Sequence, residues 1–157
     1  MIICHSGGAI GSDTIFENES KKYGIKTNAY SYKTKSHTSE NKVEISEEDY
    51  QEGILQITKA NLTLKRVGIN RFMNLLARNW PQVKYSEQIF AIGQIVNPKC
   101  KDIKEYVNKS KTDIVAGGTG YSIQMSIDNG KEIYVFDQYQ QSWFRWSYII
   151  NRFINTK

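Results

Sequence analysis

The chain has few of the residues from which disulfides, metal centres and membrane spans are built. Its 157 residues include 2 cysteines and 2 histidines. Cys4 and Cys100 are too far apart in sequence to form a CxxC pair, so we expect both thiols to be reduced, as in a cytoplasmic protein. Two histidines are too few for a zinc cluster. We therefore expect no metal site and no cofactor.

Long apolar runs are also missing. No stretch approaches the roughly 18 apolar residues of a membrane span, and Met1 leads directly into a predicted strand rather than into a secretory signal. The 2 prolines and a single polar stretch, 33–47, argue against a long disordered tail. The length fits one domain, which we place over residues 1–157.

Charge of one sign is only mildly in excess, with a net charge of +5. Lysines are scattered, with one denser stretch over 99–111, which suits either a solvated surface or attraction of an anionic ligand. No aromatic and basic strand pattern of the kind that reads nucleic acid is present. We therefore expect neither a nucleic-acid partner nor a membrane partner.

Two glycine turns are the most informative features present. Each follows a run that predicts a strand, 2–5 and 113–116, and precedes a run that predicts a helix. Glycine allows the backbone to approach a phosphate closely, and the free N–H groups of a first helical turn point toward such an anion. The two turns read Ser6-Gly7-Gly8-Ala9-Ile10-Gly11-Ser12-Asp13 and Gly117-Gly118-Thr119-Gly120. The pair indicates a site for a nucleotide or a similar phosphorylated ligand.

Strands and helices are predicted to alternate along the chain. The expected strands cover 2–5, 25–32, 88–92, 113–116 and 132–137. The expected helices cover 12–23, 46–64, 69–80, 102–109, 122–129 and 142–153, and 33–45 reads as a loop or lid. This order is typical of an α/β fold with an open parallel sheet, Rossmann-like, with helices on both faces. Ligands of such sheets bind beyond the carboxyl ends of the strands, so both turns should share one rim.

The motifs resemble those of the SLOG superfamily of Rossmann-like nucleotide-binding domains, which includes LOG-type phosphoribohydrolases and DprA-like proteins. The two glycine turns are similar to its two glycine motifs. Arg78-Asn79, followed by Ser86-Glu87 and an apolar strand, is similar to a further LOG pattern. The resemblance implies that Arg78 faces the ligand as a counter-charge.

Two departures from the LOG pattern bear on the chemistry. The second glycine turn comes some two dozen residues after the apolar strand, and Gln124 stands where LOG enzymes carry a catalytic glutamate. Glutamine can hydrogen-bond a ribose hydroxyl but cannot act as a carboxylate. A substitute carboxylate would come from Asp13, Asp128 or Asp137. Asp137 ends a predicted strand and could instead bind ribose.

The sequence therefore favours a protein that binds, senses or sequesters a nucleotide-derived signal, such as an ADP-ribose-like or cyclic nucleotide. The alternative is a LOG-like phosphoribohydrolase, with Arg78 and Asp13 as catalytic candidates; a DprA-like nucleic-acid partner is a third, weaker alternative. The aromatic tail also offers apolar surface for a homo-oligomer. The expected ligand-binding residues are Ser6, Gly7, Gly8, Ala9, Gly11, Asp13, Arg78, Asn79, Gly117, Gly118, Thr119, Gly120, Gln124 and Asp137.

Overall fold

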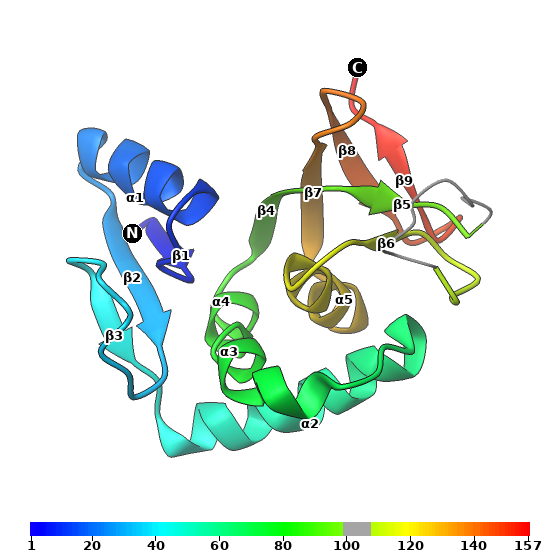
Figure 1. Ribbon diagram of the computed structural model, residues 1–157. Coiled ribbons are helices and arrows are strands. Elements are labelled where there is room, and N and C mark those ends of the chain that lie inside the picture. The colour runs from blue at the N-terminus through cyan, green and yellow to red at the C-terminus, as the bar shows by residue number, and fades with distance from the viewer. Residues whose placement is uncertain (99–107) are drawn as a thin grey trace.

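The computed structural model describes residues 1–98 and 108–157 and has strands in three sheets (Figure 1). The first part of the chain forms β1 (Ile3–Ser6), α1 (Ser12–Lys22), β2 (Lys26–Ser31) and β3 (Lys42–Glu44). β3 falls within the segment expected to be a loop. The predicted helix over 102–109 lies largely outside the described residues.

The first sheet has the order β1-β2-β3, and both of its strand pairs are parallel. Helix α1 packs on β1 and β2 through a polar contact, because the buried Glu17 accepts hydrogen bonds from the hydroxyls of Ser6 at 2.7 Å and Ser39 at 2.6 Å. The helical spacing of Ile15, Phe16, Glu19 and Tyr23 predicts one packed face for this helix, but Ile15 and Tyr23 are exposed. The inner side of α1 meets hydroxyl groups, so a carboxylate replaces the usual apolar stripe.

A layer of helices follows. The run Ser46-Glu47-Glu48-Asp49 predicts a capped helix start. Helix α2 (Glu47–Leu64) does begin with the Ser46 side chain accepting the backbone N–H of Asp49 at 3.1 Å. The single helix predicted over 69–80 is divided into a 3-10 helix, η1 (Ile69–Phe72), and two short helices, α3 (Met73–Ala77) and α4 (Trp80–Lys84). Pro81 lies in the first turn of α4, where its missing N–H costs nothing.

Close backbone approach holds α2 against α3. A Cβ atom at Gly53 of α2 would lie 2.7 Å from the backbone oxygen of Ala77, so only glycine fits without a shift. Helix α4 is tied to α2 by Lys84, whose ammonium pairs with Asp49 at 2.9 Å and Glu52 at 2.8 Å. Figure 1 shows α2 running beneath both large sheets, so this layer connects them.

The second large sheet has the order β4-β7-β8-β9, and β5 pairs with β6 in a separate two-stranded sheet. Its strands are β4 (Gln88–Gly93), β7 (Glu132–Asp137), β8 (Ser142–Ser147) and β9 (Arg152–Asn155), while the small pair is β5 (Ile95–Val96) and β6 (Ile114–Val115). β4 and β7 are parallel, whereas β7–β8, β8–β9 and β5–β6 are antiparallel. The helix predicted over 142–153 is therefore wrong.

Within residues 1–98 and 108–157, one helix covers one face of the second sheet. Helix α5 (Thr119–Asp128) packs its Ile123 and Ile127 against Ile133, Val135 and Phe144. The opposite face carries an aromatic group in which Phe90 stacks on Tyr134 with centroids 5.2 Å apart and meets Trp143 edge-on. Among the described residues, no helix has the length and apolar composition needed to cross a membrane.

The mixed α/β class is thus confirmed, whereas the described strands lie in three separate sheets of mixed direction, so the structure does not confirm the expected Rossmann-like parallel sheet. The strands preceding the two glycine turns, β1 and β6, are not neighbours: β1 pairs with β2, and β6 pairs with β5. The turns must therefore be brought together by tertiary packing rather than by adjacent strands.

Candidate functional site

One cleft brings parts of both glycine turns together. Its volume is about 870 Å³, and its walls come from β1, α1, the α3–α4 region, β4 and the start of α5. Seven of the fourteen expected ligand-binding residues line it, namely Ser6, Ala9, Asp13, Arg78, Asn79, Gly118 and Thr119. Residues of both turns therefore line one hollow, although the strands that precede them are not neighbours.

The first turn is closed by its own side chains. The Ser6 hydroxyl accepts the N–H of Gly8 at 3.0 Å, and the Asp13 carboxylate accepts the N–H of Ala9 at 3.0 Å. Gly8 has a φ of 65°, and a Cβ there would lie 2.1 Å from His37 Nε2, so glycine is required on both grounds. The sequence offers Ser12 and Asp13 as caps for α1, but neither caps it; the N-cap is Gly11, without a side-chain hydrogen bond.

Two side chains from distant parts of the chain hold the carbonyl of Gly7. Arg78 Nη1 donates to this oxygen at 2.6 Å, and His37 Nε2 lies 3.2 Å from it. Since a carbonyl only accepts, Nε2 of His37 must carry the proton. The motif around Arg78 predicted only that this side chain faces the ligand, and no pattern in the sequence pointed to His37.

The charges beside the first turn are partly buried. Burial lowers the pKa of Arg78, while the charge of Asp13 opposes that change. Burial raises the pKa of Asp13, opposed by its hydrogen bond from Ala9 and by the charge of Arg78. Among the described residues, Arg78 Nε is buried with no hydrogen-bond partner. The cleft thus contains a cation with donor capacity to spare and a carboxylate that is easier to protonate than usual.

The second turn is held from behind by Arg66, which the sequence analysis missed. Its guanidinium donates to the carbonyls of Gly117 at 2.6 Å and Val115 at 2.7 Å. In a trans peptide the C=O and the following N–H point in opposite directions, so fixing the Gly117 carbonyl turns the N–H of Gly118 away from Arg66. Gly118 lines the cleft, and its N–H belongs to the uncapped start of α5.

The structural requirement for glycine differs among the three glycines of the second turn. A Cβ at Gly120 would lie 2.0 Å from the Val115 carbonyl oxygen, so Gly120 permits α5 to pack against β6. Gly117 has a φ of 68°, which favours glycine. A Cβ at Gly118 would meet nothing within 4 Å, so this position is open on the side of its missing side chain.

Two expected ligand-binding residues are engaged elsewhere. Asp137 is 1% exposed, and its carboxylate accepts backbone N–H groups of Ile95 at 2.7 Å, Tyr139 at 2.9 Å and Gln140 at 2.7 Å. It therefore fastens the turn after β7 to β5 and does not line the cleft. Gln124 is buried and donates to Asp128 Oδ1 at 2.9 Å, on a side of α5 that faces away from the cleft.

The remaining walls of the cleft are mixed in character. Asp13 and Glu87 are the carboxylates among its lining residues, and aromatic side chains are represented by Phe16, Tyr85 and Phe90. His5 also lines the cleft, and burial lowers its pKa, so the imidazole is biased toward its neutral form. Cys4, a free thiol, lies beside it on β1.

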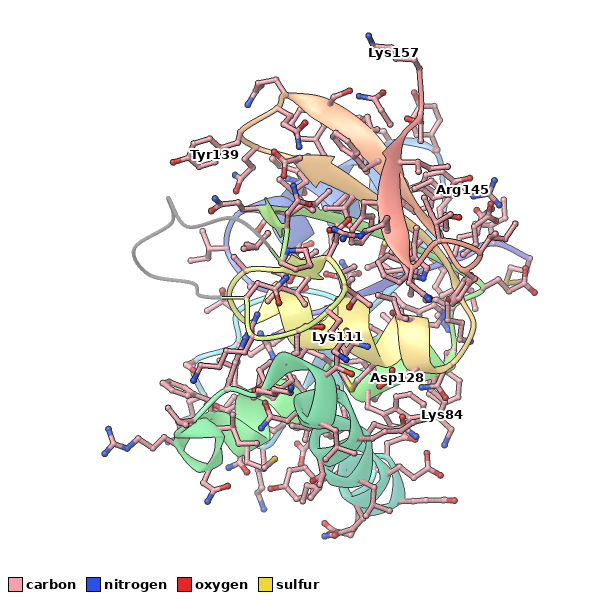
Figure 2. The ribbon with its side chains drawn as sticks, turned by 90° about the vertical axis from the view of Figure 1, so that its right-hand side faces the viewer. Lys84, Lys111, Asp128, Tyr139, Arg145 and Lys157 are labelled. Carbon is pink, nitrogen blue, oxygen red and sulfur yellow. The ribbon has the colours of Figure 1, made fainter. Side chains whose placement is uncertain are left out.

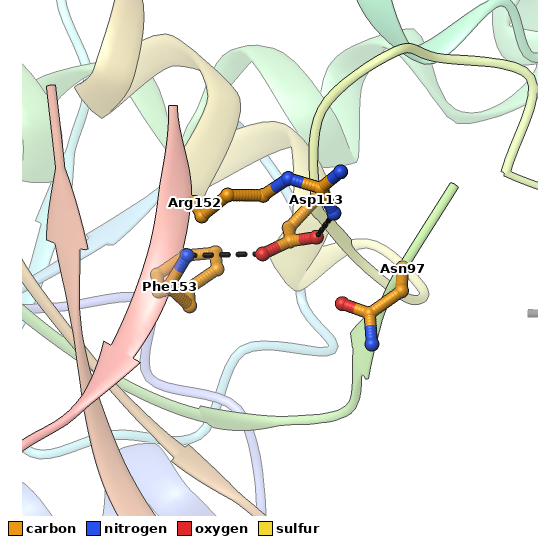
Figure 3. Close-up of a pocket in the computed structure, with 4 residues that line it drawn as sticks. All are labelled: Asn97, Asp113, Arg152 and Phe153. Carbon is orange, nitrogen blue, oxygen red and sulfur yellow. Dashed lines mark hydrogen bonds and ion pairs between the residues drawn. The ribbon is translucent and has the colours of Figure 1, made fainter. Parts of the chain in front are cut away.

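A second, smaller hollow of about 380 Å³ contains none of the expected site residues. Figure 3 shows Asp113 between Arg152 and the backbone of Phe153, with hydrogen bonds of 2.6 and 3.0 Å, and Asn97 across the hollow. This ion pair, in which Asp113 is buried and Arg152 is partly exposed, ties the residue before β6 to β9. The surface charges labelled in Figure 2, including Lys84, Lys111 and Arg145, lie apart along the molecule.

Comparison with models of known protein families, with curated proteins and with solved structures found no match in any of the three.

Proposed function

We propose that the protein binds a nucleotide or nucleotide-derived signal, of the ADP-ribose-like or cyclic type, in the cleft between β1 and β4. One observation carries the proposal: segments more than a hundred residues apart, each selected from the sequence as a phosphate turn, line one cleft together with Arg78. The resemblance to SLOG domains agrees with this function, which would be exerted in the cytoplasm. The expected self-association would use what remains exposed of the aromatic tail, Trp143 and Tyr148, because Phe144 and Trp146 are buried.

In this proposal the phosphates meet the uncapped N-terminus of α5, where Gly118 and Thr119 supply backbone N–H groups. Arg78 supplies the positive charge, because a guanidinium stays ionised in proteins, and its Nε has no hydrogen-bond partner among the described residues. Asp13 would repel a phosphate placed beside it, so it suits the ribose hydroxyls, which donate hydrogen bonds. Asn79 offers further polar contacts from the same wall.

The alternative remains hydrolysis of the N-glycosidic bond of a nucleoside 5′-monophosphate. One observation favours it: Asp13 is a cleft-lining carboxylate whose pKa is raised by burial, which suits a group that handles protons. Asp128 and Asp137, the other substitutes considered, do not line the cleft. We rank binding first, because Asp13 already uses one oxygen to hold the N–H of Ala9 within the first turn.

The test begins with the purified protein, which is denatured so that any released small molecule can be identified by mass spectrometry. The protein is then incubated with nucleoside monophosphates and ADP-ribose while the same masses are followed. An unchanged nucleotide that binds in calorimetry supports the binder. Free base and ribose 5-phosphate that appear with time, and disappear in Asp13→Asn, support the hydrolase. If no nucleotide binds or is consumed, the proposal fails.

Arg78→Ala and Arg71→Ala form a matched pair for the same assay. Arg71 lies exposed on η1 and does not line the cleft. Loss of a charge-assisted contact costs about 1.5–3 kcal/mol, so Arg78→Ala should weaken nucleotide binding by about 10- to 150-fold. Arg71→Ala should bind like the wild type, and equal affinities of the two variants would remove Arg78 from the site.

A further inference from the structure

Two sheet edges that have no strand partner in the described part of the chain face each other across the cleft. β1 is the end strand of the first sheet, and β4 is the end strand of the second. All four residues of β1 and five of the six residues of β4 line the cleft. Successive side chains of a strand point to opposite faces, so a wall formed by consecutive residues is the main-chain edge itself. The cleft therefore separates two rows of backbone N–H and C=O groups.

Neither edge carries the features that keep exposed strands from pairing. Exposed edges in natural sheets are usually protected by charged residues, proline or bulges. β1 reads Ile-Cys-His-Ser and β4 reads Gln-Ile-Phe-Ala-Ile-Gly, without proline, lysine or any acidic residue. Ile3 remains 36% exposed and Phe90 50% exposed. Both edges are thus free and suited to pair, and the nearest candidate partner of each is the other.

On both strands, alternate side chains point toward helices α4 and α5 and the others point away from them. On β1, Ser6 bonds Glu17 of α1, while His5 points the other way and lies 6.2 Å, ring to ring, from Tyr85 at the end of α4. On β4, Ile89 packs with the α5 cluster. Residues of α4 and α5 share one core cluster, so these helices form one layer. Cys4 must share the face of Ser6, and Phe90 likewise lies on the face of β4 away from that layer.

We propose that β1 and β4 pair with each other, joining the two sheets into one of order β3-β2-β1-β4-β7-β8-β9, and that ligand binding favours this closed form. The segment connecting β1 to β4 contains helices α2 to α4, a crossover of the kind that joins parallel strands. Pairing removes the middle of the cleft and leaves the end bounded by the two glycine turns. The ligand-coupled part rests on the proposed function, whereas the pairing itself does not.

Disulfide trapping tests the pairing without any ligand. Paired strands lie about 4.8 Å apart, within the Cα range that a disulfide spans. In a Cys100→Ser background, Cys4 is combined in turn with a second cysteine on β4. The test substitutions, all on the face of β4 shared with Cys4, are Gln88→Cys, Phe90→Cys and Ile92→Cys. The matched control is Ile89→Cys, which points to the opposite face.

After mild oxidation in dilute solution, intact mass and non-reducing electrophoresis report the crosslinked monomer. At least one test position should crosslink at least about tenfold faster than Ile89→Cys, because its side chain points to the same face as Cys4 and lies within the distance that a disulfide spans. Using three test positions covers a register shift and the failure of any one variant to fold. Crosslinking that is absent, or equal at Ile89→Cys, overturns the pairing. Disulfide-linked dimers would show that the edges pair between copies instead, which also overturns it.

A second arm adds ADP-ribose or a nucleoside monophosphate at saturating concentration. Faster crosslinking at the same position supports ligand-driven closure, and an unchanged rate overturns that part. Calorimetry on the wild type is run in parallel. Absence of nucleotide binding there contradicts the proposed function but leaves the ligand-free trapping result valid, so the two failures are distinguishable.

Discussion

Gly118 and Gly120 offer a sharp test of the site, because the structure gives the two glycines opposite roles only two residues apart. A Cβ at Gly120 would lie 2.0 Å from the Val115 oxygen and 2.7 Å from Arg66 Nη2, so β6 or α5 must move. Such overpacking costs about 3 kcal/mol. For a chain of this size we expect the melting temperature of Gly120→Ala to fall by about 6–12 °C.

Gly118 has a φ of −59°, which any residue adopts, and open space where a side chain would begin. Gly118→Ala should therefore stabilise by about 0.5–1 kcal/mol through the lower entropy of the unfolded chain. Gly118→Val should fold but fill the approach to the α5 N-terminus. We expect its affinity for ADP-ribose to fall by about tenfold or more, because the phosphate loses close backbone contact.

Calorimetric affinity and scanning calorimetry on the three variants complete this test. The reasoning requires stability and binding to separate: Gly118→Val loses binding with its melting temperature nearly unchanged, whereas Gly120→Ala loses stability. A Gly118→Val variant that binds normally would remove the second turn from the site. A Gly120→Ala variant as stable as the wild type would contradict the close approach of α5 to β6.

Three further substitutions test the contacts around the cleft. Arg66→Ala frees the carbonyls of Gly117 and Val115, so we expect urea denaturation to show a free energy of unfolding lower by about 2–3 kcal/mol. Nucleotide binding should also weaken, and added guanidinium ion should partly restore it. Asp137→Ala leaves three backbone N–H groups without their acceptor and should lower the free energy of unfolding by at least about 3 kcal/mol. Nucleotide affinity should stay unchanged. A loss of affinity specific for ribose-containing ligands would support the ribose-binding role predicted for Asp137 from the sequence. Burial raises the pKa of Asp13, so the folded protein binds this proton more tightly than the unfolded chain does. The stability that the proton contributes is lost as pH rises through the raised pKa. Asp13→Asn should thus gain melting temperature over the wild type near neutral pH and lose that advantage below the ordinary value of 3.8; an advantage that persists there would refute the assignment.

The local signals in the sequence were reliable where a single residue type decides the backbone. Gly8 and Gly117 have positive φ, Ser46 caps α2, and the runs before both glycine turns are strands. These features depend on sterics and hydrogen bonds within a few residues, which the sequence states directly.

The tail shows where local reasoning was misapplied. Burial alternates from Trp143 to Trp146, with Phe144 and Trp146 buried and their neighbours exposed. This is the two-residue period of a strand with one covered face. A dense aromatic segment at the end of the chain was read as a packing helix, although its alternation and β-favouring residues already indicated strands.

Other features depend on partners that only the folded chain supplies. Arg66 and His37 belong to no motif, and each reaches a glycine turn from another element. Asp137 was placed correctly at a strand end, but three backbone groups already occupy its oxygens. The division of the strands into separate sheets likewise follows from tertiary packing, because hydrophobic pattern alone does not choose strand neighbours.

The tight contact between Gly53 of α2 and Ala77 of α3 has a consequence for ligand length. Arg66 follows the end of α2 and holds the Gly117 carbonyl, while Arg78 follows the end of α3 and holds the Gly7 carbonyl. The spacing of these two helices therefore sets the separation of the two glycine turns. A larger residue at Gly53 would push α2 from the Ala77 backbone and change the distance across the cleft that the proposed ligand has to span, although Gly53 itself does not line it.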